Sequence, residues 1–247
     1  MTAFSALDLN STALLLDVDG TLIDIGPTPH DVHVPDDLRA SLARLSNLTD
    51  GATALVSGRA IADLDRIFSP LRLSVIGGHG AEMRVNGSGT MKQADLLPQG
   101  LRDWAAQLAS TPGIIVEDEG YSVAVHYRAA PKQAHRVRTH LKEGCTKFAN
   151  GADLDLLVGK AILELKRRDI SKGKAVRNLM ARPPFRARTP VFIGDDVTDE
   201  SVFDELPSLQ GKGYSVGRHF EGQTGRFETP AEVRDALHDL AASGERA

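Results

Sequence analysis

Two aspartates two positions apart, Asp17 and Asp19, follow an apolar run and precede a glycine and a hydroxyl residue, Gly20 and Thr21. A continuous apolar run such as Ala13–Val18 is typical of a strand that is buried on both faces in a parallel sheet. Parallel sheets bind ligands beyond the carboxyl ends of their strands, where the two aspartates would lie. Crowded carboxylates repel each other unless a cation or a shared proton relieves them. The stretch therefore predicts a carboxylate site that binds a cation or shares a proton.

A plain turn is the simplest alternative for this stretch, because Asp-Gly is a common hairpin signal. The pattern Asp-x-Asp-Gly also opens calcium-binding loops, whose last position is a glutamate. Counted from Asp17, that position holds Thr28, so the calcium loop is excluded. Between the two remaining interpretations we favour the carboxylate site.

Three further segments bring polar side chains to strand ends or helix starts. Ser57 follows the apolar strand Ala52–Val56 and precedes a helix, whose N-terminal N–H groups and dipole favour an anion. Lys172 lies at the start of another helix, and the acids of Gly194–Glu200 follow the buried strand Val191–Ile193. For Ser57 the alternative is a simple helix cap, the usual role of serine there. The neighbouring aspartate pair favours anion binding over capping.

The combination of these groups indicates a particular chemistry. Several carboxylates without histidine or cysteine favour a hard cation, and Mg²⁺ fits best. Magnesium, a lysine and a helix N-terminus are the parts of a phosphoryl-transfer site, where positioning and charge neutralisation dominate. One carboxylate can attack phosphorus, and a second can protonate the leaving oxygen and then activate water. Asp17 and Asp19 offer both.

Two element patterns divide the chain. Its two ends alternate strands and helices, whereas its middle reads as antiparallel strands with helices between them. Hairpin turns are predicted at Asn86–Gly87 and Gly159–Lys160. We therefore predict an α/β fold, in which an α+β cap is inserted into a Rossmann-like parallel-sheet core. The predicted domains are 1–82 with 170–247 for the core and 83–169 for the cap.

Composition excludes several classes of protein. The chain has 247 residues, a net charge of −4 and no basic block, so nucleic-acid binding has little support. The single cysteine, Cys145, excludes an internal disulfide framework and a cysteine zinc cluster. The first ten residues resemble neither a secretion signal nor a membrane span. We expect a cytoplasmic monomer without nucleic-acid or membrane partners.

Four of the segments described above resemble the four motifs of the haloacid dehalogenase superfamily of phosphohydrolases, in the same order along the chain. They are Asp17–Thr21, Ser57, Lys172 and Gly194–Glu200. The middle region is similar to that family's larger α+β cap. Within the superfamily the resemblance is closer to the trehalose-phosphatase family. The segments that carry it are Gly194–Glu200, His79–Glu82, Glu117–Tyr121, His126–Arg128, Glu164–Lys166 and Ser215–Arg218.

The resemblance implies roles for individual residues. Asp17 would be the nucleophile and Asp19 the general acid and base. Asp17, the backbone carbonyl of Asp19 and Asp195 would hold Mg²⁺, and Asp199 would brace its waters. The residues implied for phosphate binding are Thr21, Ser57, Gly58 and Lys172.

Six residues are candidates for the sugar, because sugar hydroxyls need charged and polar partners. They are Arg59, His79, Glu82, Glu117, Glu164 and Lys166. The alternative for each is a surface salt bridge, since such pairs are common and weak. His79 has a second alternative as a structural turn residue.

The family resemblance implies hydrolysis of trehalose 6-phosphate through an aspartyl phosphate. One departure concerns sugar recognition: the family pattern carries lysine after Glu117–Asp118, where this chain has Glu119. Alternatives are a phosphatase for sucrose, glucosylglycerol or mannosylglycerate phosphate, or a non-catalytic sugar-phosphate binder that partners a synthase. The intact acids and lysine argue against the last, because a pure binder has no use for Asp19.

Overall fold

The computed structural model describes residues 4–26, 32–85, 88–149, 153–159 and 161–244. The chain forms two compact units. We call Met1–Lys92 with Ser171–Ala247 the core unit, and Gln93–Ile170 the inserted unit. The predicted turn residues Asn86–Gly87 and Lys160 lie outside the described residues.

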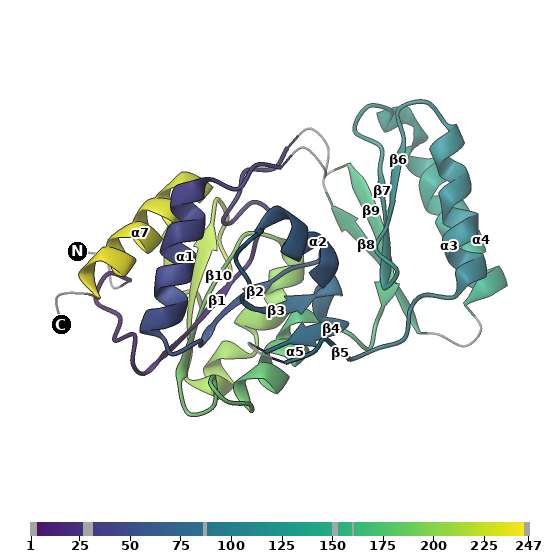
Figure 1. Ribbon diagram of the computed structural model, residues 1–247. Coiled ribbons are helices and arrows are strands. Elements are labelled where there is room, and N and C mark those ends of the chain that lie inside the picture. The colour runs from purple at the N-terminus through teal and green to yellow at the C-terminus, as the bar shows by residue number, and fades with distance from the viewer. Residues whose placement is uncertain (1–3, 27–31, 86–87, 150–152, 160, 245–247) are drawn as a thin grey trace. The chain divides into compact units, whose positions relative to one another are not determined.

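An eight-stranded sheet runs through the described part of the core unit, in the order β12-β11-β10-β1-β2-β3-β4-β5 (Figure 1). Strand β1 (Thr12–Leu16) lies in its interior and pairs in parallel with β10 (Thr189–Gly194) and β2 (Thr53–Val56). The other strands are β3 (Ser74–Gly77), β4 (Glu82–Arg84), β5 (Met91–Lys92), β11 (Lys212–Val216) and β12 (Gly225–Phe227). Among these strands only the β3-β4 and β4-β5 pairings are antiparallel and the others are parallel, so the predicted parallel sheet is confirmed.

Helices cover both faces of this sheet because its central strand is apolar on both sides. Leu14 and Leu16 pack into the cluster with α1 (Asp36–Leu48), α2 (Ile61–Ile67) and α7 (Pro230–Ser243). Ala13 and Leu15 pack on the opposite face against α5 (Lys172–Met180) and α6 (Glu200–Phe203). The short 3₁₀ helices of the core unit are η1 (Gly78–Gly80), η4 (Val197–Asp199) and η5 (Leu206–Leu209).

The inserted unit contains a second, antiparallel sheet with the order β6-β7-β9-β8. Its strands are β6 (Ile115–Asp118), β7 (Ser122–His126), β8 (Leu154–Gly159) and β9 (Ile162–Arg167). Its helices are α3 (Gln99–Ala106), η2 (Gln107–Ser110), η3 (Pro131–Gln133) and α4 (Ala134–Phe148). One face of the sheet, with Val123, Val125 and Leu163, packs against Ala105 of α3 and against Val137 and Leu141 of α4.

The start of the inserted unit differs from the predicted boundary at residue 83. Strand β4 pairs with β3, and β5 pairs with β4, so the segment up to Lys92 extends the core sheet. The change in pattern at Met83 marks a change from parallel to antiparallel pairing, which often occurs at the edge of a parallel sheet. A pattern change therefore need not mark a change of domain. At the other end, Ile170 belongs to the inserted unit.

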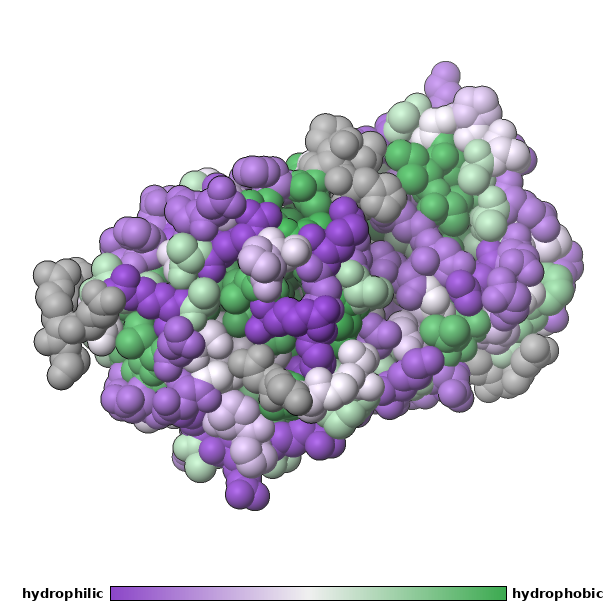
Figure 2. Space-filling model, in the orientation of Figure 1, coloured by the Kyte–Doolittle hydropathy of each residue, from purple (hydrophilic) through white to green (hydrophobic). Residues whose placement is uncertain are grey.

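The visible surface of each unit is mostly hydrophilic, with small, separate hydrophobic areas (Figure 2). The described large hydrophobic side chains that are exposed are scattered along the sequence: Ile25, Leu96, Ile115, Val158 and Val197. No helix in the described ranges has the length and apolar character needed to cross a membrane.

Candidate active site

Lys172 lies between two carboxylates at the carboxyl ends of the central strands. Its Nζ donates to Oδ1 of Asp17 and to Oδ1 of Asp199, each at 2.7 Å. All three side chains are at most 4% exposed. Burial alone lowers the pKa of Lys172, but the two carboxylates outweigh burial and raise it, so the lysine stays protonated. The structure therefore supplies one fixed positive charge among buried acids.

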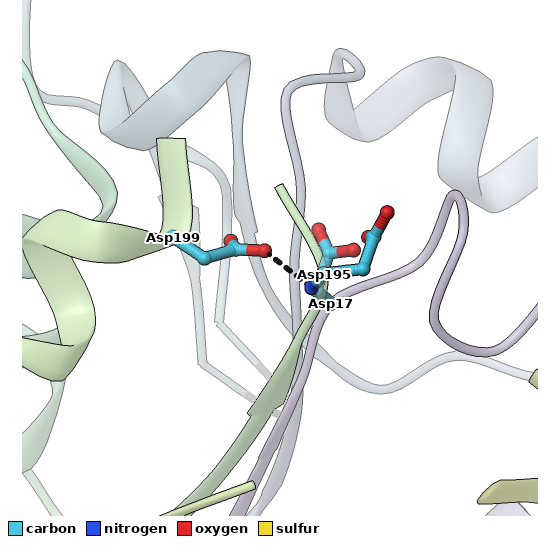
Figure 3. Close-up of side chains that lie close together, drawn as sticks. All are labelled: Asp17, Asp195 and Asp199. Atoms are coloured by element: carbon cyan, nitrogen blue, oxygen red, sulfur yellow. Dashed lines mark hydrogen bonds between the residues drawn. The ribbon is translucent and has the colours of Figure 1, made fainter. Parts of the chain in front are cut away.

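The acids exceed that single positive charge. Asp17, Asp195 and Asp199 each place a carboxylate oxygen within 4.8 Å of the others (Figure 3). Oδ2 of Asp17 is buried and accepts no hydrogen bond from the described residues. Burial and the charge of Asp199 raise the pKa of Asp17 well above its usual value and that of Asp195 to about 6. A buried bare oxygen beside like charges fits a hard divalent cation, which would keep the acids ionised.

Asp199 organises the loop that follows β10. Its Oδ2 accepts hydrogen bonds from the backbone N–H groups of Asp195 and Asp196, each at 3.0 Å, the first of which is drawn in Figure 3. Its Oδ1 accepts the bond from Lys172. A Cβ on Gly194 would lie 2.5 Å from Oδ2 of Asp199, so this bracing needs glycine at that position. Asp199 therefore orients Asp195 and neutralises part of the lysine charge.

The turn after β1 brings Gly20 and Thr21 against Asp195. Gly20 has a φ of 82°, and a Cβ there would lie 2.2 Å from Oδ2 of Asp195. Glycine is required for both reasons, since other residues resist this conformation and would displace the acid. The hydroxyl of Thr21, fully buried, donates to Oδ1 of Asp195 at 3.1 Å. Thr21, predicted to bind phosphate, thus contacts an acid of the cluster.

Asp19 has a different environment from Asp17. Its side chain is 35% exposed, compared with 4% for Asp17, and it pairs with Arg59. Nε of Arg59 donates to Oδ2 of Asp19 at 2.6 Å, and Nη2 donates to Oδ1 at 2.7 Å. Nη1 of Arg59 donates to Oδ2 of Asp63 at 2.7 Å. Arg59, predicted to bind the sugar, is bonded to two carboxylates of the core unit.

The loop after β2 differs locally from the sequence-based expectation. Helix α2 begins at Ile61, so Ser57 does not cap it. The buried Ser57 hydroxyl instead accepts from the N–H of Arg59 at 3.2 Å. Oε2 of Glu82 accepts from the N–H of Ile61 at 2.9 Å. Glu82, a predicted sugar ligand, therefore provides the hydrogen-bond acceptor at the start of α2.

His79 is built into the turn that follows β3. It has a positive φ of 55°, and its N–H donates to the carbonyl of Ser57 at 3.1 Å. Its ring packs so closely on Gly58 that a Cβ there would lie 2.5 Å from the ring. The structure thus gives His79 contacts that support the Ser57 loop, in line with the turn alternative considered for this residue.

Strand register brings the predicted sugar residues of the inserted unit to one face of its sheet. Glu117 lies opposite Ala124, which lies opposite Glu164 on the next strand, and Lys166 lies opposite Ser122. Directly paired residues share a face, so these side chains lie away from the helices α3 and α4. Nζ of the buried Lys166 donates to the carbonyl of Ile170 at 2.9 Å.

Sequence reasoning assigned no role to two partners of these residues. One is Asp63, which bonds Arg59, and the other is His126, whose Nε2 lies 2.6 Å from Oε2 of Glu117. Spacing gives a signal for the first, because Arg59 and Asp63 stand four residues apart. For the second the signal is alternation in β7, which puts His126 on the face opposite that of Val125.

Proteins of known structure share this fold. The structure of a haloacid dehalogenase-like hydrolase from B. subtilis matches with a TM-score of 0.63 and 16% identity, over 92% of this chain and 98% of that chain. The C-terminal domain of the C. albicans trehalose-6-phosphate phosphatase matches with a TM-score of 0.79 and 24% identity, over 94% and 92%. These matches, each under 25% identical, show that the chain has the α/β fold of a haloacid dehalogenase-like hydrolase, with acids at the ends of its central strands.

Sequence comparison is more specific. The family model described as trehalose-phosphatase matches residues 15–239. The trehalose-6-phosphate phosphatase of Escherichia coli (strain K12) is 40% identical over 211 residues, which cover 83% of this chain and 77% of that protein. The chain belongs to the trehalose-phosphatase family, and the resemblance in its motifs is confirmed.

Proposed function

We infer that this chain is a phosphatase that hydrolyses trehalose 6-phosphate to trehalose and inorganic phosphate. The observation that carries the chemistry is the buried Asp17 with one bare carboxylate oxygen, held by Lys172 beside two further acids. The sugar is inferred from family membership and from a relative of that activity at 40% identity. Phosphatases of other sugar phosphates are not favoured by these relatives.

In the proposed mechanism Asp17 attacks phosphorus, and the bond between phosphorus and the sugar oxygen breaks. Asp19 gives a proton to that oxygen, so that trehalose leaves and an aspartyl phosphate remains. Asp19, now a carboxylate, takes a proton from water as the water attacks the aspartyl phosphate. Phosphate is released and Asp17 is restored.

The phosphate needs positive and hydrogen-bonding partners during both steps. We assign Lys172 this role because its ammonium lies beside Asp17. We propose Ser57, Gly58 and Thr21 as further partners of the phosphate. Mg²⁺ would be held by Asp17, the backbone carbonyl of Asp19 and Asp195, with Asp199 bracing that set, and it would neutralise charge on the transferred group. The acid cluster supports this set through its excess of carboxylates and the bare oxygen of Asp17.

The sugar is proposed to meet the sheet face of the inserted unit that the helices leave uncovered. Glu117 and Glu164 share that face and can accept hydrogen bonds from hydroxyl groups. Lys166 is a weaker candidate, because its ammonium is buried and bonded to the Ile170 carbonyl. Among the core-unit candidates, Arg59, His79 and Glu82 support neighbouring loops and side chains. We further propose that the enzyme is monomeric and cytoplasmic.

Phosphate release from a panel of sugar phosphates tests the proposed function. The panel contains trehalose 6-phosphate and the phosphates of sucrose, glucosylglycerol and mannosylglycerate, each with Mg²⁺ and with EDTA. We expect the highest kcat/KM for trehalose 6-phosphate and loss of turnover with EDTA. Equal or faster turnover of another sugar phosphate would overturn the trehalose assignment. In D17N, loss of turnover with retained binding of trehalose 6-phosphate separates an enzyme from a binding protein.

A further inference from the structure

A line of charged contacts runs from Asp19 to helix α2. Both oxygens of Asp19 accept from Arg59, at 2.6 and 2.7 Å, and the remaining terminal nitrogen of the guanidinium donates to Asp63 at 2.7 Å. The Arg59 side chain is only 10% exposed, so this bridge is largely shielded from solvent. A planar guanidinium bonded at both ends fixes direction as well as distance.

Asp19 depends on such a contact for its position. It lies beyond the end of β1, and the structure gives its backbone one isolated bridge, to Ile23, in place of a strand ladder. Its side chain is 35% exposed, so packing holds it far less firmly than it holds the buried Asp17. Proton transfer requires the carboxyl group to stay within hydrogen-bond reach of the leaving oxygen. Arg59 supplies the contact that limits this side chain.

Arg59 also needs a fixed partner, because its long side chain has several rotatable bonds. Asp63 supplies one from α2, a helix held by the buried residues Ile61, Leu64 and Ile67. Hydrogen bonds from Arg59 and Arg66 outweigh burial and lower the pKa of Asp63, so Asp63 is ionised at neutral pH. Asp63 thus carries the negative charge that its ion pair with Arg59 requires.

We propose that Asp63 is a positioning residue for the phosphatase reaction: through Arg59 it fixes the carboxylate of Asp19 for proton transfer. The proposal rests on the proposed function, since it assigns a partner to the group that exchanges protons there. Asp63 contacts neither the acid cluster nor Lys172 by any described hydrogen bond, so it acts through Arg59.

The test compares D63A and D63N with wild type, using Mg²⁺ and trehalose 6-phosphate. We expect D63A to lower kcat about tenfold with KM changed less than about twofold, because misplacement of a reacting group acts on the chemical step. D63N should fall between them, because its amide oxygen can still accept from Arg59. In a D19N background, D63A should change the residual rate by less than about twofold, because no carboxylate remains to be positioned.

D65N is the matched control. Asp65 lies on the same helix and accepts a bidentate pair of bonds from Arg84, but it has no described bond to Arg59. We expect D65N to keep kcat within about twofold of wild type, whatever it does to stability. A kcat in D63A equal to that in D65N would overturn the proposal. So would a change in KM alone, or an equal loss from D63A in the D19N background. Wild type without Mg²⁺-dependent phosphate release would instead overturn the proposed function, and the proposal with it.

Discussion

Replacing Lys172 with methionine tests whether the acid cluster needs an internal positive charge. Methionine keeps a side chain of similar length but removes the ammonium that donates to Asp17 and Asp199. Breaking a buried ion pair on one side costs about 3–5 kcal/mol, because the other charge stays buried without compensation. For a unit of this size that corresponds to a fall in Tm of about 6–20 °C. K172M should also lose most of its phosphatase activity.

The pH dependence of this loss follows from the pKa of Asp17. Burial and the charge of Asp199 raise that pKa well above its usual value, and Lys172 opposes the shift. An acid with a raised folded-state pKa binds its proton more tightly when folded, so its ionisation destabilises the fold as pH rises. The stability deficit of K172M relative to wild type should therefore be smaller at pH 5 than at pH 7.

Thermal unfolding followed by circular dichroism, in EDTA, measures this deficit. K174M is the matched control, since Lys174 is an exposed lysine of the same helix, and it should cost less than about 0.5 kcal/mol. D17N should recover much of the loss in the K172M background, because it removes one of the two acids left without a cation. A K172M protein within about 1 kcal/mol of wild type at pH 7 would refute the reasoning. The reasoning would also be refuted if the stability losses of K172M and D17N added in full in the double variant.

Three further predictions concern the neighbouring turn, the metal and the surface. G20A should lower kcat about 100-fold, because its Cβ would displace Asp195, and steady-state kinetics with Mg²⁺ check this. Mg²⁺ at 100 times its Kd should stabilise wild type by about 2.7 kcal/mol, measured as a rise in Tm. The rise should be smaller in D195N. An equal rise in both proteins would show that the ion binds elsewhere. Hydrogen bonds from Arg84 lower the pKa of Asp65, so its stabilisation is present above the unfolded value of about 3.9 and is lost as pH falls below it. Urea unfolding should show the difference between wild type and D65N narrowing from pH 6 to pH 3.

The sequence is most informative where local pattern and topology coincide. Asp17 and Asp195 each follow an apolar strand, and neighbouring parallel strands end at the same edge. Their approach therefore follows from topology once both strands are assigned. Lys172 is predicted from a different local pattern, since it is the first residue of an amphipathic helix.

Other features depend on contacts between distant segments, which no local pattern contains. Helix α2 starts at Ile61, whose N–H donates to the carboxylate of Glu82. Glu82 lies 21 positions further along the chain. Arg59 reaches Asp19 across a separation of 40 positions, so no local pattern favours this partner over a sugar. The edge hairpin β4-β5 joins the core sheet because β3 offers it an open edge, a fact about pairing rather than composition.

The fold separates two aspartates that the sequence places side by side. Asp17 continues the ladder of β1 through its N–H bond to the carbonyl of Ile193, which holds its carboxylate inside the protein beside Lys172. Asp19 lies past the ladder, where its carboxylate is partly exposed and bonds a guanidinium. A nucleophile must stay rigid and dry, whereas a proton carrier must reach both the leaving group and water. A one-residue deletion at Val18 would place the second acid directly after Asp17, where successive side chains face opposite ways, so it should abolish turnover even if the protein folds.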